Sequence, residues 1–298
     1  MEKITNCPVC GNTNHSPYLN GIDYFLTKQP FTIVACKECG FRFTNPRPDQ
    51  FEIIPYYQTE NYIAHDTSKG SLLESIYKFI RKIALANKFN IIKSFPGGKT
   101  ILDIGCGTGE FLNYCKIKGY TAIGIEPNSK ARTFAKEKYG LTVKEETYLS
   151  ELPTASIDVI TLWHVLEHVH LLPEYLERIF RLLKPEGTLL IALPNSNSWD
   201  ANKYKQFWAA FDLPRHLYHF TPQSLKMLVE KNKFILNKTL PLKFDSYYIS
   251  LLSEKYMSGH HNYIQAFING LVSNFYAKSH QNNYSSLIYI CKLTPGGK

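Results

Sequence analysis

The sequence contains no run of about 18 or more uncharged apolar residues, the length that a helix needs to cross a bilayer. Its start, MEKITNCPVC, lacks the apolar core of a secretory signal. It also has no internal repeat, no low-complexity tract and no block of five or six consecutive like charges. These absences argue against a membrane-spanning helix and a basic binding tail, and they predict a cytoplasmic location.

The composition is that of a globular protein with a substantial core. The chain has 298 residues, of which 44% are hydrophobic and 20% charged, so we expect one large domain with a small appendage. Seven cysteines, an odd number in a chain without a secretory signal, favour reduced thiols over disulfides. The net charge of +9 suits RNA, anionic headgroups or phosphorylated substrates, although a merely basic surface accounts for it equally well.

Four of the cysteines form two C-x2-C pairs, which are Cys7 with Cys10 and Cys36 with Cys39. A turn of this spacing points both sulfurs at one place, and two such turns supply the four tetrahedral ligands of a structural zinc ion. A closed four-thiolate site has no open position for water, so it performs no chemistry. We therefore predict a zinc-ribbon-like module over residues 1–45, with redox pairs or unliganded buried thiols as the alternatives.

The stretch after the second pair, FRFTNPRPDQFEIIPYY, is rich in proline and tyrosine and is typical of an extended linker. Apolar residues then recur at helical spacing within SLLESIYKFIRKIALANKF and predict a helix that packs on the main domain. The predicted organisation is the zinc module at 1–45, a linker and helix at 46–95, and the main domain at 96–298. The apolar stripe of the helix consists of Leu72, Leu73, Ile76, Phe79, Ile80 and Ile83.

From Lys99 onward, strand-like and helix-like segments alternate. TILDIG, YTAIGIEP, SIDVITLWHV and GTLLIALP predict buried strands, and GEFLNYCKIKG, SKARTFAKEKYG and PEYLERIFRLLKP predict helices. This alternation indicates a doubly wound α/β fold, in which helices cover both faces of a parallel sheet and ligands bind beyond the carboxyl ends of the strands. Thr221-Pro222 predicts the start of another helix, and FILNKTLPL and SSLIYICKL predict two closing strands.

A helical insertion at about 245–283 separates the two closing strands. Its apolar residues at helical spacing are Ile264, Phe267, Ile268, Leu271, Val272 and Phe275. This pattern predicts an amphipathic helix. Only Lys278 follows closely, too little positive charge for a helix that lies on a membrane. We therefore expect the stripe to pack against the domain, with the insertion as a lid or wall over the substrate.

The strand ILDIG runs directly into CGTGEF, a tight turn with glycine at every second position. Glycines let the backbone approach a ligand closely, and the helix that follows offers unpaired N–H groups. Glu126 ends the next strand, where it can accept both hydroxyls of a ribose. A dinucleotide loop reads G-x-G-x-x-G, whereas here the third glycine comes one residue early and Glu110 follows it. Asp103 and Glu110 favour instead a nucleoside that carries a positive amino or sulfonium group.

The segments LDIGCGTGEF, GIEPN, SIDVITLWHVLEHV and LLKPEGTLLIALPN resemble, in this order, the successive motifs of class I S-adenosylmethionine-dependent methyltransferases. The resemblance implies a Rossmann-like seven-stranded methyltransferase sheet, with the glycine turn around the methionine moiety and Glu126 on the ribose. Trp163 would lie beside the cofactor or serve as a core aromatic. Glu146, Thr147 and Tyr148 are open candidates for the contact with adenine. The implied cofactor residues are Asp103, Gly105, Cys106, Gly107, Gly109, Glu126, Pro127, Thr147, Trp163 and His164.

The cysteine pairs, the Pro- and Tyr-rich stretch and RHLYHFT together resemble a bacterial subgroup of these enzymes. The resemblance implies O- or N-methylation of a small-molecule, sugar or glycan-like acceptor in a biosynthetic pathway. Sugar C-methyltransferases of related layout continue into a further domain where this sequence stops, so we expect an acceptor other than a sugar carbon.

An oxygen or nitrogen acceptor must lose a proton, and histidine is the side chain whose ordinary pKa suits that task. The candidate catalytic residues are His164, His168, Arg215, His216 and His219. We predict His216 as the general base and Arg215 as a grip on a carboxylate or phosphate, although any of the histidines can instead have a structural role. A metal ion on His164 and His168 is disfavoured, because no third ligand is evident and Glu167 is expected to point elsewhere.

Two other functions stay open. One is an RNA methyltransferase that uses the zinc module, which the net charge of +9 would suit. Against it, the module has no dense Lys/Arg stripe with interleaved aromatics, and the gap of 25 residues between the cysteine pairs is long. The other is an inactive scaffold, which the intact glycine turn and Glu126 disfavour. The sequence does not indicate an oligomeric state.

Overall fold

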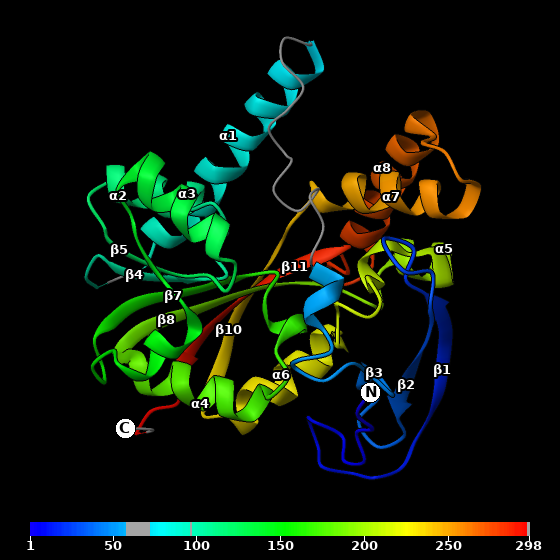
Figure 1. Ribbon diagram of the computed structural model, residues 1–298, viewed down its shortest axis with the longest axis horizontal. Helices are drawn as coiled ribbons and strands as arrows, with labels where there is room; N and C mark the ends of the chain where they lie inside the picture. The colour runs from blue at the N-terminus through cyan, green and yellow to red at the C-terminus, as the bar shows by residue number, and fades with distance from the viewer. Residues whose placement is uncertain (58–71, 96, 297–298) are drawn as a thin grey trace. The chain divides into compact units, whose positions relative to one another are not determined.

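The computed structural model describes residues 1–57, 72–95 and 97–296 (Figure 1). The chain divides into two compact units. Unit 1 is formed by Met1–Gln58, His164–Tyr175 and Ile191–Ile290, and unit 2 by Thr59–Trp163, Leu176–Leu190 and Cys291–Lys298. This division groups residues 1–45 with much of the C-terminal half, so it follows packing rather than chain order. The predicted domain boundaries after residues 45 and 95 stay predictions.

Seven strands form one sheet in the order β10-β11-β8-β7-β4-β5-β6. The strands are β4 (Thr100–Ile104), β5 (Thr121–Ile125), β6 (Thr142–Lys144), β7 (Ile157–Trp163), β8 (Leu183–Pro194), β10 (Phe234–Pro241) and β11 (Ser286–Leu293). The pairings of β4 with β5, β4 with β7 and β5 with β6 are parallel. Every residue of β7 except the last is buried, as expected for a strand covered on both faces. The predicted seven-stranded α/β fold is confirmed.

Three helices accompany these strands in unit 2, as Figure 1 shows for α1, α2 and α3 beside β4 and β5. They are α1 (Leu72–Lys93), α2 (Glu110–Ile117) and α3 (Ser129–Tyr139). Asn128 caps α3, because its side chain accepts a hydrogen bond from Ala131 N at 3.1 Å. The helix predicted over the 70s and 80s is confirmed as α1. Of its predicted apolar stripe only Ile83 has a described side chain, which is half-buried, and the other five positions lie outside the described side chains.

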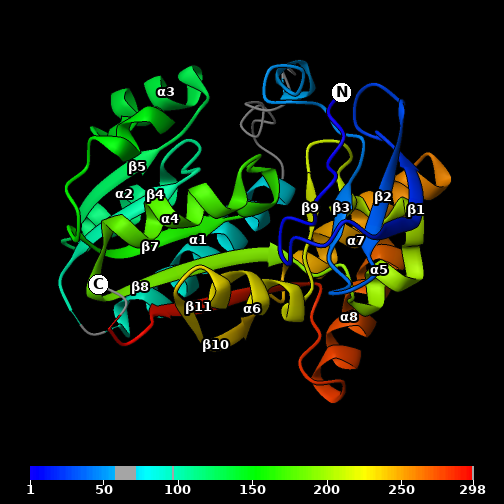
Figure 2. The same cartoon turned by 90° about the horizontal axis from the view of Figure 1, so that it is seen from below.

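Unit 1 contains a second, antiparallel sheet in the order β1-β2-β3-β9, whose strands lie side by side in Figure 2. The strands are β1 (His15–Ile22), β2 (Pro30–Cys36), β3 (Arg42–Thr44) and β9 (Tyr218–His219). The prediction of an extended linker directly after the cysteine pairs is wrong for its first residues. Phe41 and Phe43 are fully buried and contact Tyr218, and β3 pairs with β9, because burying these rings outweighs the turn-forming tendency of the prolines that follow.

The remaining helices are α4 (Leu172–Leu182), α5 (Trp199–Tyr204), α6 (Pro222–Lys231), α7 (Asp245–Ser258) and α8 (Tyr263–Ser279). Among them, α4, α6, α7 and α8 bear out predicted elements, whereas α5 was not predicted. Short 3-10 turns cover Ile54–Tyr57, Glu146–Ser150, Leu166–His168, Lys205–Phe207 and Ala209–Phe211. Thr221 caps α6 as predicted, since its hydroxyl accepts from Ser224 N at 3.2 Å. The predicted helical insertion is the pair α7 and α8. No helix in the described part of the chain combines the length and apolarity that crossing a bilayer requires.

The prediction that the apolar stripe of the insertion packs inward is wrong. The side chains of Ile264, Phe267 and Phe275 are 76%, 58% and 71% exposed. The buried face of α8 instead carries small or polar residues, which are Ala266, Asn269, Gly270, Ser273 and Ala277. Gly270 explains the choice of face, because a Cβ there would lie 2.6 Å from a ring carbon of Tyr247 on α7. The two helices therefore approach too closely for a stripe of large side chains between them.

Candidate functional site

The turn after β4, in unit 2, is held by backbone hydrogen bonds. Gly105 N and Cys106 N both donate to Ile125 O, at 2.7 and 3.0 Å, and Gly109 N donates to Cys106 O at 3.0 Å. The three glycines have φ values of 70°, 55° and 80°, in the left-handed region that other residues avoid. Gly109 is followed directly by the first turn of α2. The predicted glycine turn is therefore formed at the carboxyl end of β4, where doubly wound sheets bind ligands.

Gly109 and Gly107 are needed in this turn for different reasons. A Cβ at Gly109 would lie 2.7 Å from Leu141 Cδ1 and 3.0 Å from Ala135 Cβ, so this glycine lets the turn pack against the protein. A Cβ at Gly107 would meet no atom within 4 Å. Gly107 therefore leaves open space beside the backbone, as a ligand-binding turn needs.

We expect Gly107→Ala to fold but to bind an S-adenosylmethionine-like nucleoside at least 10-fold more weakly, because the new methyl group occupies that open space. The left-handed φ adds a strain of roughly 1–2 kcal/mol. Gly119→Ala is the matched control, since Gly119 has a φ of 84° and open space around it but lies after α2. Equal affinities of the two variants, measured by calorimetry, would show that Gly107 does not face the ligand.

Glu126 closes the turn from the neighbouring strand. Its Oε2 accepts a hydrogen bond from Gly107 N and its Oε1 one from Asn128 N, both at 2.9 Å. Burial raises the pKa of the Glu126 carboxyl, and the hydrogen bonds from Asn128 and Gly107 partly oppose that rise. Each oxygen keeps a second lone pair, so the carboxylate can tie down the turn and still accept from ribose hydroxyls.

Asp103, at the end of β4, is the other buried carboxyl group of this site. It is 2% exposed, and Thr161 Oγ1 donates to its Oδ1 at 2.6 Å. Burial raises the pKa of Asp103 to about 7, although the hydrogen bond from Thr161 acts in the opposite direction. A carboxyl group in this environment is stabilised in its charged form by a cationic ligand.

Trp163 is the last residue of β7, and its surroundings fit both of its predicted roles, beside the cofactor and in the core. Its ring meets Phe111 edge to face at 5.5 Å, and the ammonium of Lys88 lies 4.2 Å from the ring centre. Its indole Nε1 is buried without a hydrogen-bond partner among the described residues. The apolar contacts fit a core aromatic and the unused donor fits a ligand contact, so its role stays a prediction.

The candidates for the adenine contact lie in the 3-10 turn Glu146–Ser150. Thr147 is exposed and donates to Glu145 Oε1 at 3.4 Å, and Glu146 Oε1 lies 3.9 Å from a guanidinium nitrogen of Arg178. Neither geometry singles out one of them. The roles of Cys106, Pro127, Glu146, Thr147 and Tyr148 stay predictions.

The four cysteine thiols converge in unit 1, as the sequence predicts. The Sγ atoms of Cys7 and Cys39 lie 3.6 Å apart and those of Cys10 and Cys36 3.5 Å apart, and all four lie within 4.8 Å of one another. Zinc–sulfur bonds of about 2.3 Å in a tetrahedron place the sulfurs about 3.8 Å apart, whereas disulfide sulfurs lie about 2.05 Å apart. The cluster therefore fits the four-thiolate zinc site that the spacing predicts, and the bound zinc itself is a proposal.

His164, the residue after Trp163, has a φ of 57°, so the chain does not continue as a helix there. Its Nε2 lies 3.0 Å from Asp245 Oδ2 and its Nδ1 3.4 Å from Glu167 Oε1. Burial would lower the pKa of His164, but Asp245 and then Glu167 outweigh it and raise the pKa to about 10. His164 is therefore protonated near neutral pH, the wrong form for a general base.

The expectation that Glu167 points away from the histidines is wrong. Glu167, His168 and His216 each offer a ligand atom, and these atoms lie within 4.8 Å of one another. Because of the left-handed His164, the segment WHVLEHV forms only the short turn Leu166–His168, and helical spacing does not apply to it. Burial would raise the pKa of Glu167, but His164, His216 and His168 outweigh it and lower that pKa. The pKa of His168 is lowered to about 4, first by burial and then by the charge of His216.

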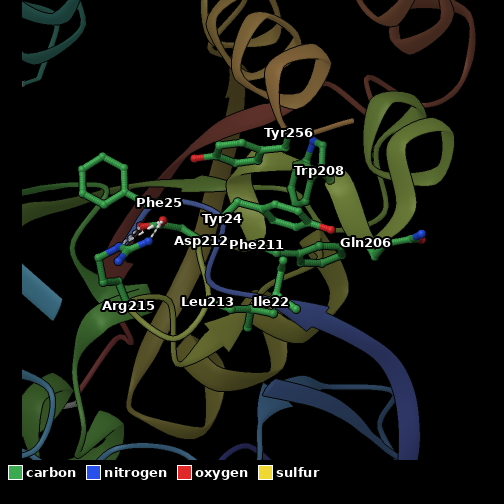
Figure 3. Close-up of a pocket in the computed structure, with 10 residues that line it drawn as sticks. All are labelled: Ile22, Tyr24, Phe25, Gln206, Trp208, Phe211, Asp212, Leu213, Arg215 and Tyr256. Carbon is green, nitrogen blue, oxygen red and sulfur yellow. Dashed lines mark hydrogen bonds and ion pairs between the residues drawn. The ribbon is translucent and has the colours of Figure 1, made fainter. Parts of the chain in front are cut away.

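Arg215 has two carboxylate partners from within unit 1. Its guanidinium donates to both oxygens of Asp212, at 2.6 to 3.0 Å, and to Asp23 Oδ1 at 3.1 Å. Figure 3 shows the pair with Asp212 at the edge of a small aromatic hollow that includes Tyr24, Trp208 and Tyr256. The hollow has about 230 Å³ of empty space, a volume that includes open solvent. The predicted grip on a substrate anion stays a prediction, and these internal ion pairs compete with it.

His219 lies in β9 and is 4% exposed, and its Nε2 lies 3.1 Å from the hydroxyl of Thr44. Burial lowers the pKa of His219 well below its ordinary value, and the charges of His216 and Arg42 lower it further.

The carboxylate partners of Arg215 and His164, which are Asp23, Asp212 and Asp245, were not predicted from the sequence. They lie in separate segments without any shared motif, so the sequence carried no signal for them.

Comparisons with known proteins extend these observations. A family model described as a methyltransferase domain matches residues 76–236. A ubiquinone biosynthesis O-methyltransferase of Rhodopseudomonas palustris is 34% identical over 51% of this chain and 65% of its own length. A second ubiquinone biosynthesis O-methyltransferase, from Photobacterium profundum, is 28% identical over 69% of this chain and 84% of its own length. A malonyl-[acyl-carrier protein] O-methyltransferase of Pectobacterium atrosepticum is 25% identical over 43% of this chain and 51% of its own length.

The first five relatives in this comparison are matched over only 53–65% of their own length. Among solved structures, a Pyrococcus horikoshii protein aligns over 80% of this chain and 99% of its own, with 11% identity and a TM-score of 0.50. That likeness concerns the fold alone.

Proposed function

Because the chain belongs to the class I S-adenosylmethionine-dependent methyltransferase family, we propose that it transfers the methyl group of S-adenosylmethionine to an oxygen of a small-molecule or glycan-like acceptor. The observation that carries the proposal is the glycine turn at the end of β4, with open space at Gly107 and Glu126 closing it from β5. This arrangement offers backbone groups to the methionine moiety and a carboxylate to the ribose.

The transfer forms a bond between the acceptor oxygen and the methyl carbon and breaks the bond between that carbon and the sulfonium sulfur. A neutral thioether leaves, so the leaving group needs no acid. Asp103, buried beside the turn, would favour the cationic cofactor over its neutral product, because only the cofactor carries the sulfonium charge. In-line placement of the two reacting atoms would supply much of the acceleration.

Relatives named as O-methyltransferases of ubiquinone biosynthesis and of malonyl-[acyl-carrier protein] support oxygen over nitrogen as the acceptor atom. The acceptor proton must then pass to a base. Among the candidate histidines, carboxylate neighbours raise the pKa of His164, and burial lowers the pKa values of His168 and His219. His216 stays the first candidate for the base.

Incubation with methyl-labelled S-adenosylmethionine and a cell extract, separated into RNA, protein, lipid-glycan and small-molecule fractions, tests the proposal. We expect label in the small-molecule or glycan fraction, and we expect Gly107→Ala to incorporate at least 10-fold less than Gly119→Ala at limiting cofactor. Release of the label by ester- or ether-cleaving chemistry would identify oxygen as the acceptor atom. Label that enters only RNA or protein would contradict the proposal.

A further inference from the structure

Glu167 is a buried carboxylate that forms an ion pair with His164 but has no hydrogen bond of normal geometry among the described residues. Its side chain is 1% exposed, and neither carboxylate oxygen has a hydrogen-bond partner among the described residues. The nearest ring nitrogens are His164 Nδ1, which lies 3.4 Å from Oε1, and His216 Nε2, which lies 4.0 Å from it. Buried polar atoms of this kind call for an explanation, and an ion at the site is one.

The two neighbouring histidines are oriented by the backbone. His168 Nδ1 lies 2.9 Å from the carbonyl oxygen of Arg215, and His216 Nδ1 lies 2.8 Å from that of Ala210. A carbonyl oxygen can only accept, so these contacts place the proton on Nδ1 in both rings, and in the neutral imidazole Nε2 keeps its lone pair. The hydroxyl of Tyr57 also lies 2.9 Å from His168 Nδ1 and fits this arrangement when it accepts from Nδ1 and donates to Arg215 O at 3.4 Å. Metal-binding histidines are typically held in this way, with one ring nitrogen donating to a carbonyl and the other facing the ion.

Glu167 is fixed against the same segment, because its backbone oxygen accepts from Leu217 N at 2.8 Å. One ligand atom from each of Glu167, His168 and His216 lies within 4.8 Å of the other two. Bonds of about 2.1 Å to a tetrahedral ion place ligand atoms about 3.4 Å apart, so binding would draw these side chains inward by about 1 Å.

We propose that Glu167, His168 and His216 form a second metal site, separate from the cysteine cluster, for a divalent first-row transition ion such as Zn²⁺. Two imidazoles and one carboxylate suit Zn²⁺, Fe²⁺ or Co²⁺ better than Mg²⁺ or Ca²⁺, which prefer oxygen ligands throughout. Three protein ligands leave at least one coordination position for water or another oxygen. Ligation through Nε2 also occupies the lone pair that His216 would use as a base, so the two roles exclude each other.

Cobalt titration of the metal-free protein tests the site and separates it from the cysteine cluster. Thiolate ligands give Co²⁺ an intense near-ultraviolet charge-transfer band, whereas nitrogen and oxygen ligands give only weak visible bands. The wild type should bind two equivalents, one of each kind. Glu167→Gln and His216→Gln should keep the thiolate equivalent and lose the other.

His170→Gln is the matched control, because His170 lies on the same loop, bonded to Pro48 O at 3.2 Å, and should retain both equivalents. The retained thiolate band and the far-ultraviolet dichroism show that each variant is folded. A wild type with a single equivalent, or variants that still bind two, would overturn the site. Neither outcome depends on methyl transfer, so the proposed function is tested separately.

Discussion

Replacing Asp103 with asparagine is expected to weaken S-adenosylmethionine binding about 100-fold and at the same time to stabilise the unliganded protein. Asparagine keeps the shape and can still accept from Thr161, but it cannot offer a negative charge to the cationic ligand, and charged hydrogen bonds contribute roughly 1.5–3 kcal/mol. The unliganded protein becomes more stable, because the substitution removes a carboxylate that is desolvated in the fold. Calorimetric titration and thermal unfolding measure the two effects.

The direction of the stability change caused by Asp103→Asn follows from the pKa of Asp103 in the folded and unfolded protein. Burial raises the pKa of Asp103 to about 7 in the folded protein, from an ordinary value of 3.8. As pH rises from about 4 to 7, the unfolded chain loses this proton before the folded protein does, so Asp103 destabilises the fold increasingly, and above pH 7 the effect is complete. The stability advantage of Asp103→Asn should therefore be near zero at pH 4, grow to on the order of a few kcal/mol by pH 7 and then remain flat.

Asp158→Asn is the matched control, because hydrogen bonds outweigh burial there and lower the pKa of Asp158. Lys184 Nζ lies 2.8 Å from its Oδ1 and Thr100 N donates to its Oδ2 at 3.0 Å. This substitution should destabilise the protein at pH 7 and leave cofactor affinity unchanged. A stability difference for Asp103→Asn that does not vary with pH would contradict the proposed burial effect.

Loss of the zinc ligands is expected to have the second large effect. Cys36→Ser should release the metal and lower the free energy of unfolding by at least a few kcal/mol, since structural zinc supplies roughly 10–16 kcal/mol in isolated zinc-finger peptides. Cys36 is 2% exposed at the end of β2, and the buried Phe41 and Phe43 follow it, so the damage should extend into the four-stranded sheet. Zinc content and the unfolding temperature with and without a chelator measure the loss.

Cys115→Ser serves as the control, because Cys115 is fully buried in α2 and outside the cluster. It should retain zinc, and a chelator should lower its unfolding temperature as it does that of the wild type, whereas Cys36→Ser should no longer respond. Wild-type protein that contains no zinc and does not respond to a chelator would show that the thiols have another role.

The parts of the fold that could be predicted are those in which one local pattern determines the structure. The strand IDVITLW is almost continuously apolar because it is buried on both faces, and only a covered parallel sheet offers that environment. The glycine turn and the C-x2-C pairs are equally local, since each specifies a backbone shape within a few residues.

The parts that could not be predicted depend on contacts between distant segments or on one unusual residue. Arg215 and Asp23 are 192 residues apart and share no pattern, so neither the ion pair nor its effect on Arg215 is visible in the sequence. The direction of Glu167 follows from the left-handed φ of His164, which helical spacing does not anticipate. In α8, the periodicity located the apolar stripe, but the close approach at Gly270 decided that the opposite face is buried.

The decisive experiment is a calorimetric titration of S-adenosylmethionine into the wild type, Glu126→Ala and Gly119→Ala, each shown to be folded by far-ultraviolet dichroism. With the cofactor in the turn after β4, the wild type and Gly119→Ala should bind one equivalent with similar affinity. Glu126→Ala should bind at least 10-fold more weakly, because it loses both the ribose acceptor and the hydrogen bond to Gly107 N. Unchanged affinity in Glu126→Ala, or no binding to the wild type, would contradict the assignment of this turn as the cofactor site.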